Sequence, residues 1–292
     1  MAGNLTNNND MKKIFVFALL SVITLAANAT DLFTGNQHVT WGEGIQFEAA
    51  KFADAKAGDK IVINYADASD GIELKVMNEN FDRLPGSLAW KGINGEGTVE
   101  QFLTSAAVAQ LKQYGLEVIG ANFNVTKVEL TEGKDNVTEN TAWTGYFWMD
   151  EWSTLEIVKT SFDGVNWANV KAIRFCSEAN RTDYVINVMT DWAADAKIAD
   201  QNTMTMTNEY AELNLDGIDM PAFLAKSDRL MIQCNKEGGD PFNFTSVELV
   251  MDASGINAVE STSTSVIYDI TGRKASSDAK GILIVNGKKY IK

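Results

Sequence analysis

The chain repeats itself. The stretch FNVTKVEL at residues 123–130 returns as FNFTSVEL at residues 242–249, with six of the eight residues identical. Earlier landmarks recur in the same order, Phe33-Thr34-Gly35 as Trp143-Thr144-Gly145, Trp41 as Trp152, Phe47 as Ile157, Phe52 as Phe162 and Val76-Met77 as Val188-Met189. The separation between equivalent residues is 110 or 111 up to Phe52, 112 at Val76-Met77 and 119 at the closing stretch. A preserved order with a growing separation indicates a duplicated domain with loop insertions, so the sequence predicts two copies of one fold.

Each copy has the pattern of antiparallel β-structure. Apolar and polar residues alternate over short runs, which predicts half-buried strands, and pairs such as Gly58-Asp59 and Asp70-Gly71 separate the runs as turns. The runs are 61–65, 72–76, 116–118 and 126–130 in the first copy and 155–157, 184–188, 230–232 and 247–249 in the second. One short helix per copy is predicted, at 105–114 and 220–225. Copies of this size and pattern fit β-sandwiches of the jelly-roll kind, each able to bury its own core.

The N-terminus has the layout of a secretory signal peptide. Lys12-Lys13 precede an apolar run from Ile14 to Ala27, and Ala27-Asn28-Ala29 offers small residues for cleavage. We therefore expect residues 1–29 to be an N-terminal extension and signal peptide, with cleavage after Ala29 and a secreted or outer cell-surface location. The remaining chain has 23 basic and 38 acidic side chains, a net charge of −15. Such a surface repels nucleic acid and anionic lipid, so a membrane is expected to matter only for export or surface attachment.

The C-terminus differs in composition from the repeats. Residues 253–265 form a linker rich in serine and threonine, and residues 266–292 contain two apolar runs and an Asn286-Gly287 hairpin signal. Tyr268 to Arg273 (YDITGR) and Gly281 to Lys289 (GILIVNGKK) resemble the C-terminal sorting domain of secreted Bacteroidetes proteins, although Leu283 stands where that family has tyrosine. The resemblance implies export across the outer membrane, or another destination in the cell envelope.

The repeated unit has four recognisable parts, which are the two openings at 33–35 and 143–145, Ala57 to Ile61, the hairpin from Leu74 to Leu84, and the closing Phe-Asn-x-Thr-x-Val-Glu-Leu. In these parts it resembles the non-catalytic carbohydrate-binding sandwich modules that accompany polysaccharide-degrading enzymes in the same bacteria. The second copy lacks the Ala-Gly-Asp turn. The resemblance implies an all-β chain of two tandem antiparallel β-sandwich domains, jelly-roll and galactose-binding-like, at 30–132 and 140–252, followed by the linker 253–265 and a small C-terminal β tail at 266–292.

The sequence offers little material for catalysis. His38 is the single histidine, so His-dependent triads and multi-histidine metal sites have almost no residues to draw on, and neither G-x-S-x-G nor a phosphate-binding glycine loop occurs. A glycosidase needs only two carboxylates at a defined separation, but neither copy has an E-x-D-x-x-E cluster. We therefore expect no enzyme activity, no catalytic residue and no cofactor. Structural calcium would suit an acidic sandwich, but no ligand loop of recognisable spacing supports it, so metal ligands stay unassigned.

Aromatic side chains are the natural candidates for binding. Sugar rings stack their C–H faces on flat indoles, while their hydroxyl groups need amide, carboxylate or hydroxyl partners. The predicted ligand-binding residues are Trp41, Phe81, Trp90, Trp148, Trp152 and Trp192. The repeat pairs Trp41 with Phe81, and Trp152 with Trp192, as equivalent stacking platforms, whereas Trp143 is expected in the core. The alternative for each platform residue is a ring that caps the core from its rim. The polar partners stay open among Asn36, Gln37, Asp82, Arg83, Asp150, Glu151, Asp191, Asn235 and Asp240.

These features predict a secreted or cell-surface, non-catalytic protein that binds a plant or other polysaccharide. The alternatives are a structural or adhesive surface protein that binds other proteins and, less favoured, a glycoside hydrolase. Coplanar exposed rings in a groove would favour sugar, a flat apolar patch a protein partner, and two facing carboxylates a hydrolase. Cys176 and Cys234 leave two alternatives, a disulfide, which export would permit, or two buried thiols on neighbouring strands.

Overall fold

The computed structural model describes residues 29–150, 152–178, 186–199, 209–234 and 241–252, together with four short strands of the C-terminus. The signal-peptide prediction, the linker 253–265, and Glu151, Asn235 and Asp240 lie outside the described residues. The chain up to Met251 forms one compact unit, and the chain from Asp252 onward forms another. The domain boundaries at 132 and 140 therefore stay predictions, and residues 30–131 and 141–251 are called the first and second halves below.

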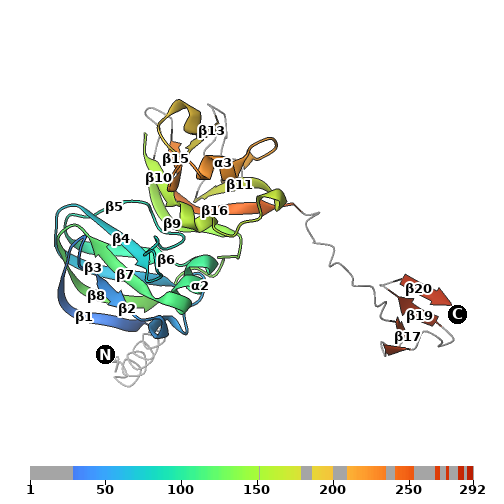
Figure 1. Ribbon diagram of the computed structural model, residues 1–292, viewed down its shortest axis with the longest axis horizontal. Coiled ribbons are helices and arrows are strands. Elements are labelled where there is room, and N and C mark those ends of the chain that lie inside the picture. Colours follow the sequence, from blue (N-terminus) through green and yellow to red (C-terminus); the bar gives the residue numbers. More distant parts are fainter. Residues whose placement is uncertain are drawn as a thin grey trace, which may run out of the picture. The chain divides into compact units, whose positions relative to one another are not determined.

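The first half consists of two four-stranded antiparallel sheets, with strand orders β1-β8-β3-β6 and β2-β7-β4-β5 (Figure 1). The strands are β1 (Thr30–Val39), β2 (Ile45–Phe47), β3 (Lys60–Ala68), β4 (Gly71–Val76), β5 (Lys91–Gly92), β6 (Gly95–Phe102), β7 (Leu116–Gly120) and β8 (Phe123–Thr131). A 3-10 helix, η1 (Ala49–Phe52), follows β2, and helix α2 (Ser105–Tyr114) links β6 to β7. Helix α2 begins where the Thr104 side chain accepts the N–H of Ala107, and it ends at Gly115, whose φ is 91°.

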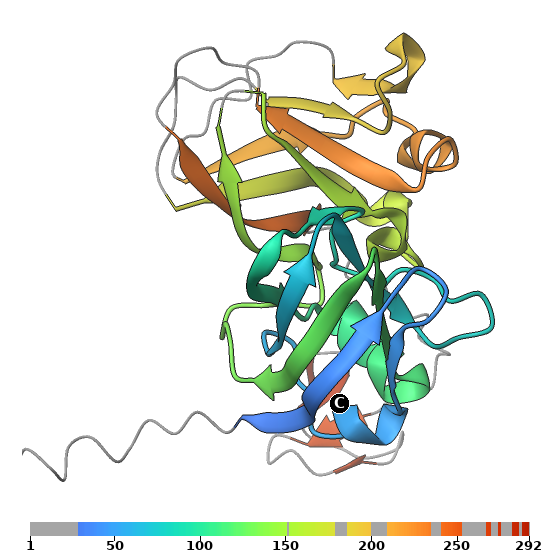
Figure 2. The ribbon, with the colours of Figure 1, turned by 90° about the vertical axis from the view of Figure 1, so that its left-hand side faces the viewer.

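The second half repeats this topology. Its sheets have the orders β9-β16-β11-β14 and β10-β15-β12-β13, so every strand number of the first half is raised by eight (Figures 1 and 2). The strands are β9 (Thr141–Met149), β10 (Thr154–Val158), β11 (Val170–Ser177), β12 (Ile186–Met189), β13 (Lys197–Ala199), β14 (Tyr210–Asn214), β15 (Arg229–Cys234) and β16 (Phe242–Met251). The helices are η2 (Lys159–Phe162), η3 (Trp167–Asn169), η4 (Ala194–Ala196) and α3 (Met220–Leu224), and α3 occupies the place of α2. The register also repeats, because Phe33 faces Val128 as Trp143 faces Val247.

Each half buries its own hydrophobic core between its two sheets. In the first half Ile61 and Phe123 of one sheet meet Leu116 of the other, and all three are fully buried. In the second half Phe175 and Ile232 play the same part. Eight strands in two packed sheets of this kind make a jelly roll, so the predicted all-β, jelly-roll sandwich architecture is confirmed. Trp143 is buried in the second core, as predicted.

One segment belongs to both halves. Residues 82–92, here called the crossover segment, follow β4 and end with β5. On one side the N–H of Leu84 donates to the carbonyl of Leu74 at 2.8 Å, next to β4. On the other side the N–H of Ala89 donates to the carbonyl of Glu156 at 2.8 Å, and the N–H of Val158 donates to the carbonyl of Ser87 at 3.2 Å, both with β10. The crossover segment thus joins the sheet of β4 to the edge of the sheet of β10.

The connection between β8 and β9 is also held by both halves. The N–H of Lys134 donates to the carbonyl of Gly58 at 2.8 Å in the first half. Its ammonium donates to the carbonyls of Gly145 at 2.7 Å and Thr245 at 3.1 Å in the second half, and lies 4.2 Å from the ring centroid of Tyr146. Partial removal from water lowers the pKa of Lys134. Two separate segments therefore fix the halves to one another.

The unit that starts at Asp252 contains a four-stranded antiparallel sheet of order β18-β17-β19-β20. Its strands are β17 (Ile267–Asp269), β18 (Lys274–Ala275), β19 (Ile282–Val285) and β20 (Lys288–Ile291). The predicted small C-terminal β tail is therefore confirmed as β-structure, while the turn residues Asn286 and Gly287 lie outside the described part. Within the described chain no helix is long and apolar enough to cross a membrane.

The two cysteines are not on neighbouring strands, which corrects one of the sequence alternatives. Cys176 lies on β11 and Cys234 on β15, and these strands belong to different sheets. Cys234 points into the second core, and the two thiols are not joined by a disulfide.

Candidate functional site

The outer face of the sheet β2-β7-β4-β5 carries the candidate site. Ile72 and Leu74 of β4 point into the first core, so Gly71, Glu73 and Lys75, which alternate with them, face outward. This face lies next to the crossover segment and therefore next to β10 of the second half.

Two tryptophans stack at one end of this face. Trp41 lies in the turn between β1 and β2, and Trp90 immediately precedes β5. Their ring centroids are 6.1 Å apart at an interplanar angle of 27°, and the residues are 44% and 46% exposed. The indole of Trp90 rests on Gly71, where a Cβ atom would lie only 2.4 Å from the ring. This tryptophan pair is thus held from below by a glycine while much of its surface stays open to water.

One hollow adjoins Trp90, and a second hollow shares Arg83 with it as a lining residue. The first has a volume of about 570 Å³, and the second of about 380 Å³. The first is lined by Arg83, Leu88, Ala89, Trp90, Lys91, Gly92, Phe147, Thr154, Glu156 and Arg229. The second is lined by Glu73, Lys75, Phe81, Asp82, Arg83, Val158, Lys159, Thr160 and Asp228. Together they form the junction groove, with an aromatic residue at each end and side chains from both halves along it.

Ion pairs hold the polar side chains of the junction groove. The guanidinium of Arg83 donates to Glu73 at 2.8 Å and to Asp228 at 2.5 Å, so it bridges the two halves. Burial by itself would lower the pKa of Arg83, but the bonds to Glu73 and Asp228 outweigh it and raise the pKa. Arg229 pairs with Glu156 at 3.0 Å through Nη1, while its buried Nε has no hydrogen-bond partner among the described residues. The groove therefore presents charged side chains that are held in place by ion pairs.

The six predicted binding residues are all exposed, but the predicted partner of Trp41 is wrong. The ring stacked on Trp41 is Trp90, whereas Phe81 lies at the far end of the junction groove. The error arose because the repeat aligned Phe81 with Trp192, while the long connection that contains both Phe81 and Trp90 folds back along β4. The exposed fractions are 41% for Phe81, 57% for Trp148, 52% for Trp152 and 56% for Trp192.

The predicted residues of the second half lie away from the junction groove. Trp152 occupies the turn between β9 and β10, which is equivalent to the turn of Trp41, and Trp192 lies between β12 and β13. Trp148 lies on β9 opposite Asn243 of β16, whose amide is held by Glu178 at 2.9 Å. Because neighbouring strand residues point to opposite faces, Trp148 faces away from Phe147, which lines the groove. The pairing of Trp152 with Trp192 stays a prediction.

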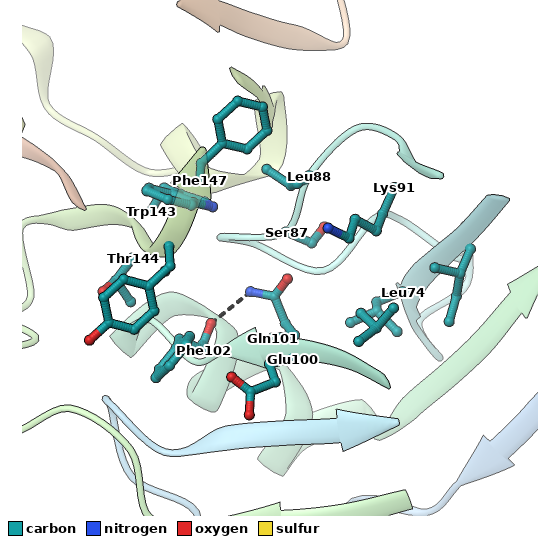
Figure 3. Close-up of a pocket in the computed structure, with 14 residues that line it drawn as sticks. Leu74, Ser87, Leu88, Lys91, Glu100, Gln101, Phe102, Trp143, Thr144 and Phe147 are labelled. Atoms are coloured by element: carbon teal, nitrogen blue, oxygen red, sulfur yellow. Dashed lines mark hydrogen bonds between the residues drawn. The ribbon is translucent and has the colours of Figure 1, made fainter. Parts of the chain in front are cut away.

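A small cavity lies where the two halves pack against one another. It has a volume of about 70 Å³ and is lined by β4, β6, the crossover segment and β9 (Figure 3). Gln101 points into it and donates to the carbonyls of Phe102 at 2.7 Å and Gly86 at 2.8 Å. Ser87 also lines it, and its hydroxyl has no protein partner within the described chain. A polar space of this size suits ordered water rather than a sugar ring.

A further cavity, of about 160 Å³, brings two carboxylates together. It lies beside α2 and is lined by Asp82 and Asp163 among others. The amide of Asn78 donates to Asp82 at 2.8 Å. Partial desolvation raises the pKa of Asp163, Lys159 opposes that shift, and Asp82 adds to it. Sequence reasoning did not find this pair, because the two residues come from different halves. No cluster of three potential metal ligands occurs in the residues that the structure describes.

Comparisons with known proteins give little beyond this geometry. No family model matches the chain, and no curated protein matches it. Among solved structures the chain is similar to SGBP-B of the Bacteroides ovatus mixed-linkage glucan utilization locus, solved in complex with a mixed-linkage heptasaccharide. The two are 15% identical over 35% of this chain and 29% of that chain, with a TM-score of 0.31. A likeness of this extent carries no argument about function.

Proposed function

We propose that the protein is a secreted or cell-surface, non-catalytic protein that binds polysaccharide on the outer face of the first half. The tryptophan pair is the observation that carries this proposal. Two exposed indoles stack on one another, and that of Trp90 rests on Gly71. A groove lined with charged side chains starts beside Trp90. Trp41 and Trp90 would stack on the C–H faces of sugar rings.

The rigidity of the pair supports this role. A side chain that is ordered before binding loses less conformational entropy when the ligand arrives. Trp90 is held by Gly71 below it and by Trp41 beside it. The carboxylates and guanidinium groups of the junction groove supply hydrogen bonds for the hydroxyl groups of a sugar, which an apolar surface would leave unpaired.

The same groove argues against an adhesive protein surface. Protein interfaces have an apolar, charge-depleted core. The surface of the junction groove is strongly polar, because charged side chains that form ion pairs line it. These are Arg83, Glu73, Asp228, Glu156 and Arg229. A polar groove with one exposed aromatic platform suits sugar better than protein.

The test is affinity electrophoresis in gels that contain soluble β-glucan, xylan, mannan, starch or pectin. We expect at least one polymer to retard the protein without losing chain length, and Trp90→Ala to remove that retardation. Tyr114→Ala is the control, because Tyr114 is an exposed aromatic at the end of α2, outside every predicted site. Unretarded migration in all five gels, or full retardation of the Trp90 variant, would contradict the proposal.

A glycoside hydrolase is the second candidate, and the Asp82–Asp163 pair is the observation that favours it. Two carboxylates face one cavity, and one of them has a raised pKa, as the general acid of a glycosidase requires. The exposed tryptophans do not line this cavity. Release of reducing ends from the same polymers, abolished by Asp163→Asn, would establish hydrolysis. Polymers that keep their full chain length would contradict the hydrolase, and binding would then be the remaining proposal.

A further inference from the structure

We propose that the bound polysaccharide crosses the junction between the halves, so that Glu156 and Arg229 of the second half act as specificity residues for a neutral sugar chain that also stacks on the tryptophan pair of the first half. The inference rests on the proposed function. It makes one composite site out of both halves instead of a platform on one of them.

The first argument is the way in which Trp90 is placed. Trp90 follows Ala89, whose N–H donates to the carbonyl of Glu156 at 2.8 Å. The bridge between Leu88 and Ile157 continues the same antiparallel pairing, and Leu88 packs against the core of the second half. The position of the Trp90 ring is therefore set by the second half as well as by Gly71.

The second argument is the lining of the larger hollow. Trp90 and Lys91 come from the first half, and Thr154, Glu156 and Arg229 come from the second. Glu156 joins the two sets directly, because its backbone carbonyl holds the crossover segment while its carboxylate holds Arg229. Adjacent strands lie about 4.8 Å apart, so the ion pair lies within the reach of an extended sugar chain that starts on Trp90.

The third argument is unused hydrogen-bonding capacity. Arg229 bonds Glu156 through Nη1, and its Nε, which has no partner within the described chain, is buried and so does not face the ligand. The carboxylate of Glu156 keeps acceptor positions beyond that bond. A site that presents fixed donors and acceptors rejects a sugar whose hydroxyl groups point the wrong way, because the charged groups would then be left unpaired.

The fourth argument concerns the charge of the ligand. The chain as a whole carries a net charge of −14. In the groove, Arg83 is neutralised by Glu73 and Asp228, and Arg229 by Glu156. Lys75, Lys91 and Lys159 also line the groove, and with Asp82 they leave its lining with one more positive than negative charge. That single charge is small beside the net charge of −14, which repels a uronate polymer. The groove fits a neutral polysaccharide.

The experiment measures dissociation constants of the full chain by affinity electrophoresis with neutral β-glucan, xylan, mannan and starch, and with polygalacturonate as an acidic probe. We expect Glu156→Gln and Arg229→Gln each to weaken binding of the retarding neutral polymer by about tenfold. Arg174→Gln is the matched control, since Arg174 pairs with Glu212 on another sheet with a similar exposure. It should bind as the parent does.

Stability is controlled in the same series. Thermal midpoints separate loss of the groove from loss of the fold, and Thr154→Val repeats the test without removing a charge, since Thr154 lines the same hollow. If Trp90→Ala removes binding while Glu156→Gln, Arg229→Gln and Thr154→Val all bind as the parent, the composite site is wrong and the proposed function stands. If the Trp90→Ala variant also binds as the parent does, or if no polymer is bound, both the composite site and the proposed function are wrong. Stronger retardation by polygalacturonate than by every neutral polymer would overturn the assignment to neutral sugar.

Discussion

At the scale of single residues, the placement of Trp90 beside the junction groove depends on Gly71, which has no side chain. Gly71 faces outward on β4 beneath Trp90, and any Cβ there would press into the indole. The sequence signals a turn at Asp70-Gly71 but says nothing of a ring packed on the glycine. The stacked pair is therefore a consequence of tertiary packing, which local patterns do not encode.

Gly71→Ala should displace Trp90 and weaken polysaccharide binding several-fold. The added methyl group overpacks the contact with the indole, which costs about 1–3 kcal/mol of stability where the ring does not yield. Gly42→Ala is the matched control, because Gly42 lies in the Trp41 turn with no atom within 4 Å of the added Cβ. Binding curves and thermal midpoints of both variants check this. Equal binding by Gly71→Ala and the parent would show that the ring does not rest on the glycine.

Lys134→Met should destabilise the chain up to Met251 by about 2 kcal/mol at pH 7. The carbonyls of Gly145 and Thr245 lose a charged donor, and hydrogen bonds to charged groups contribute more than neutral ones. Lys171→Met, an exposed lysine on β11, should change little. Denaturant unfolding of the three proteins measures the difference.

The same lysine predicts a dependence on alkaline pH. Desolvation lowers the pKa of Lys134 from its ordinary value of 10.5, so the folded protein releases this proton at a lower pH than the unfolded chain does. Between the two pKa values the unfolded state binds more protons, and this contribution to stability rises with pH until it levels off above the ordinary pKa of 10.5. Lys134→Met should lack that rise, and an identical pH profile in both proteins would contradict the assignment.

At the scale of elements, the short runs predicted the strands well where apolar and polar residues alternate without interruption. Helix 105–114 coincides with α2, and the runs at 72–76 and 230–232 fall within β4 and β15. Strand β6 was missed because Gly95 and Gly97 interrupt its alternation. The structure explains Gly97, since a Cβ there would lie 2.6 Å from the hydroxyl of Tyr65 on β3.

The crossover segment could not be predicted, because its pairing partner β10 is distant in sequence and belongs to the other half. The repeat predicted the fold of each half, and the exposed positions of its aromatics followed from it. The contact of Trp41 with Trp90 and the sharing of the groove by Glu156 and Arg229 depend on how the halves pack. A sequence pattern within one copy carries no information about contacts between the two halves.

Ala89→Pro should uncouple the crossover segment from β10. Proline has no N–H, so the carbonyl of Glu156 loses the bond from Ala89. We expect a loss of about 1–3 kcal/mol in unfolding free energy, together with weaker polysaccharide binding, because Trp90 follows directly. Ala89→Gly keeps the donor and serves as the control. Circular dichroism melts and gel retardation would report both effects, and a proline variant that matches the glycine variant in both would refute the role of this bond.

At the scale of the whole molecule, the chain consists of two compact units. The unit up to Met251 contains both cores, the tryptophan pair and the junction groove, and the unit from Asp252 contains a separate four-stranded sheet. The proposed division assigns glycan binding to the first unit, and export or surface attachment to the second together with the signal peptide. In this proposal the two halves contribute two walls of one groove, so their exposed aromatics need not be equivalent.

Ending the chain after Asp252 should leave the thermal midpoint of the first unit and its retardation by polysaccharide unchanged. The boundary at Met251 separates two compact units, and the linker that follows it is rich in serine and threonine. Calorimetry of the full and shortened chains should therefore show the same main transition, and the gels should give the same dissociation constants. In the organism of origin, the shortened chain should fail to reach the surface or the medium although it still folds. A lower midpoint or weaker binding after truncation would show that the C-terminal sheet supports the groove, and normal surface delivery would remove the sorting role from the tail.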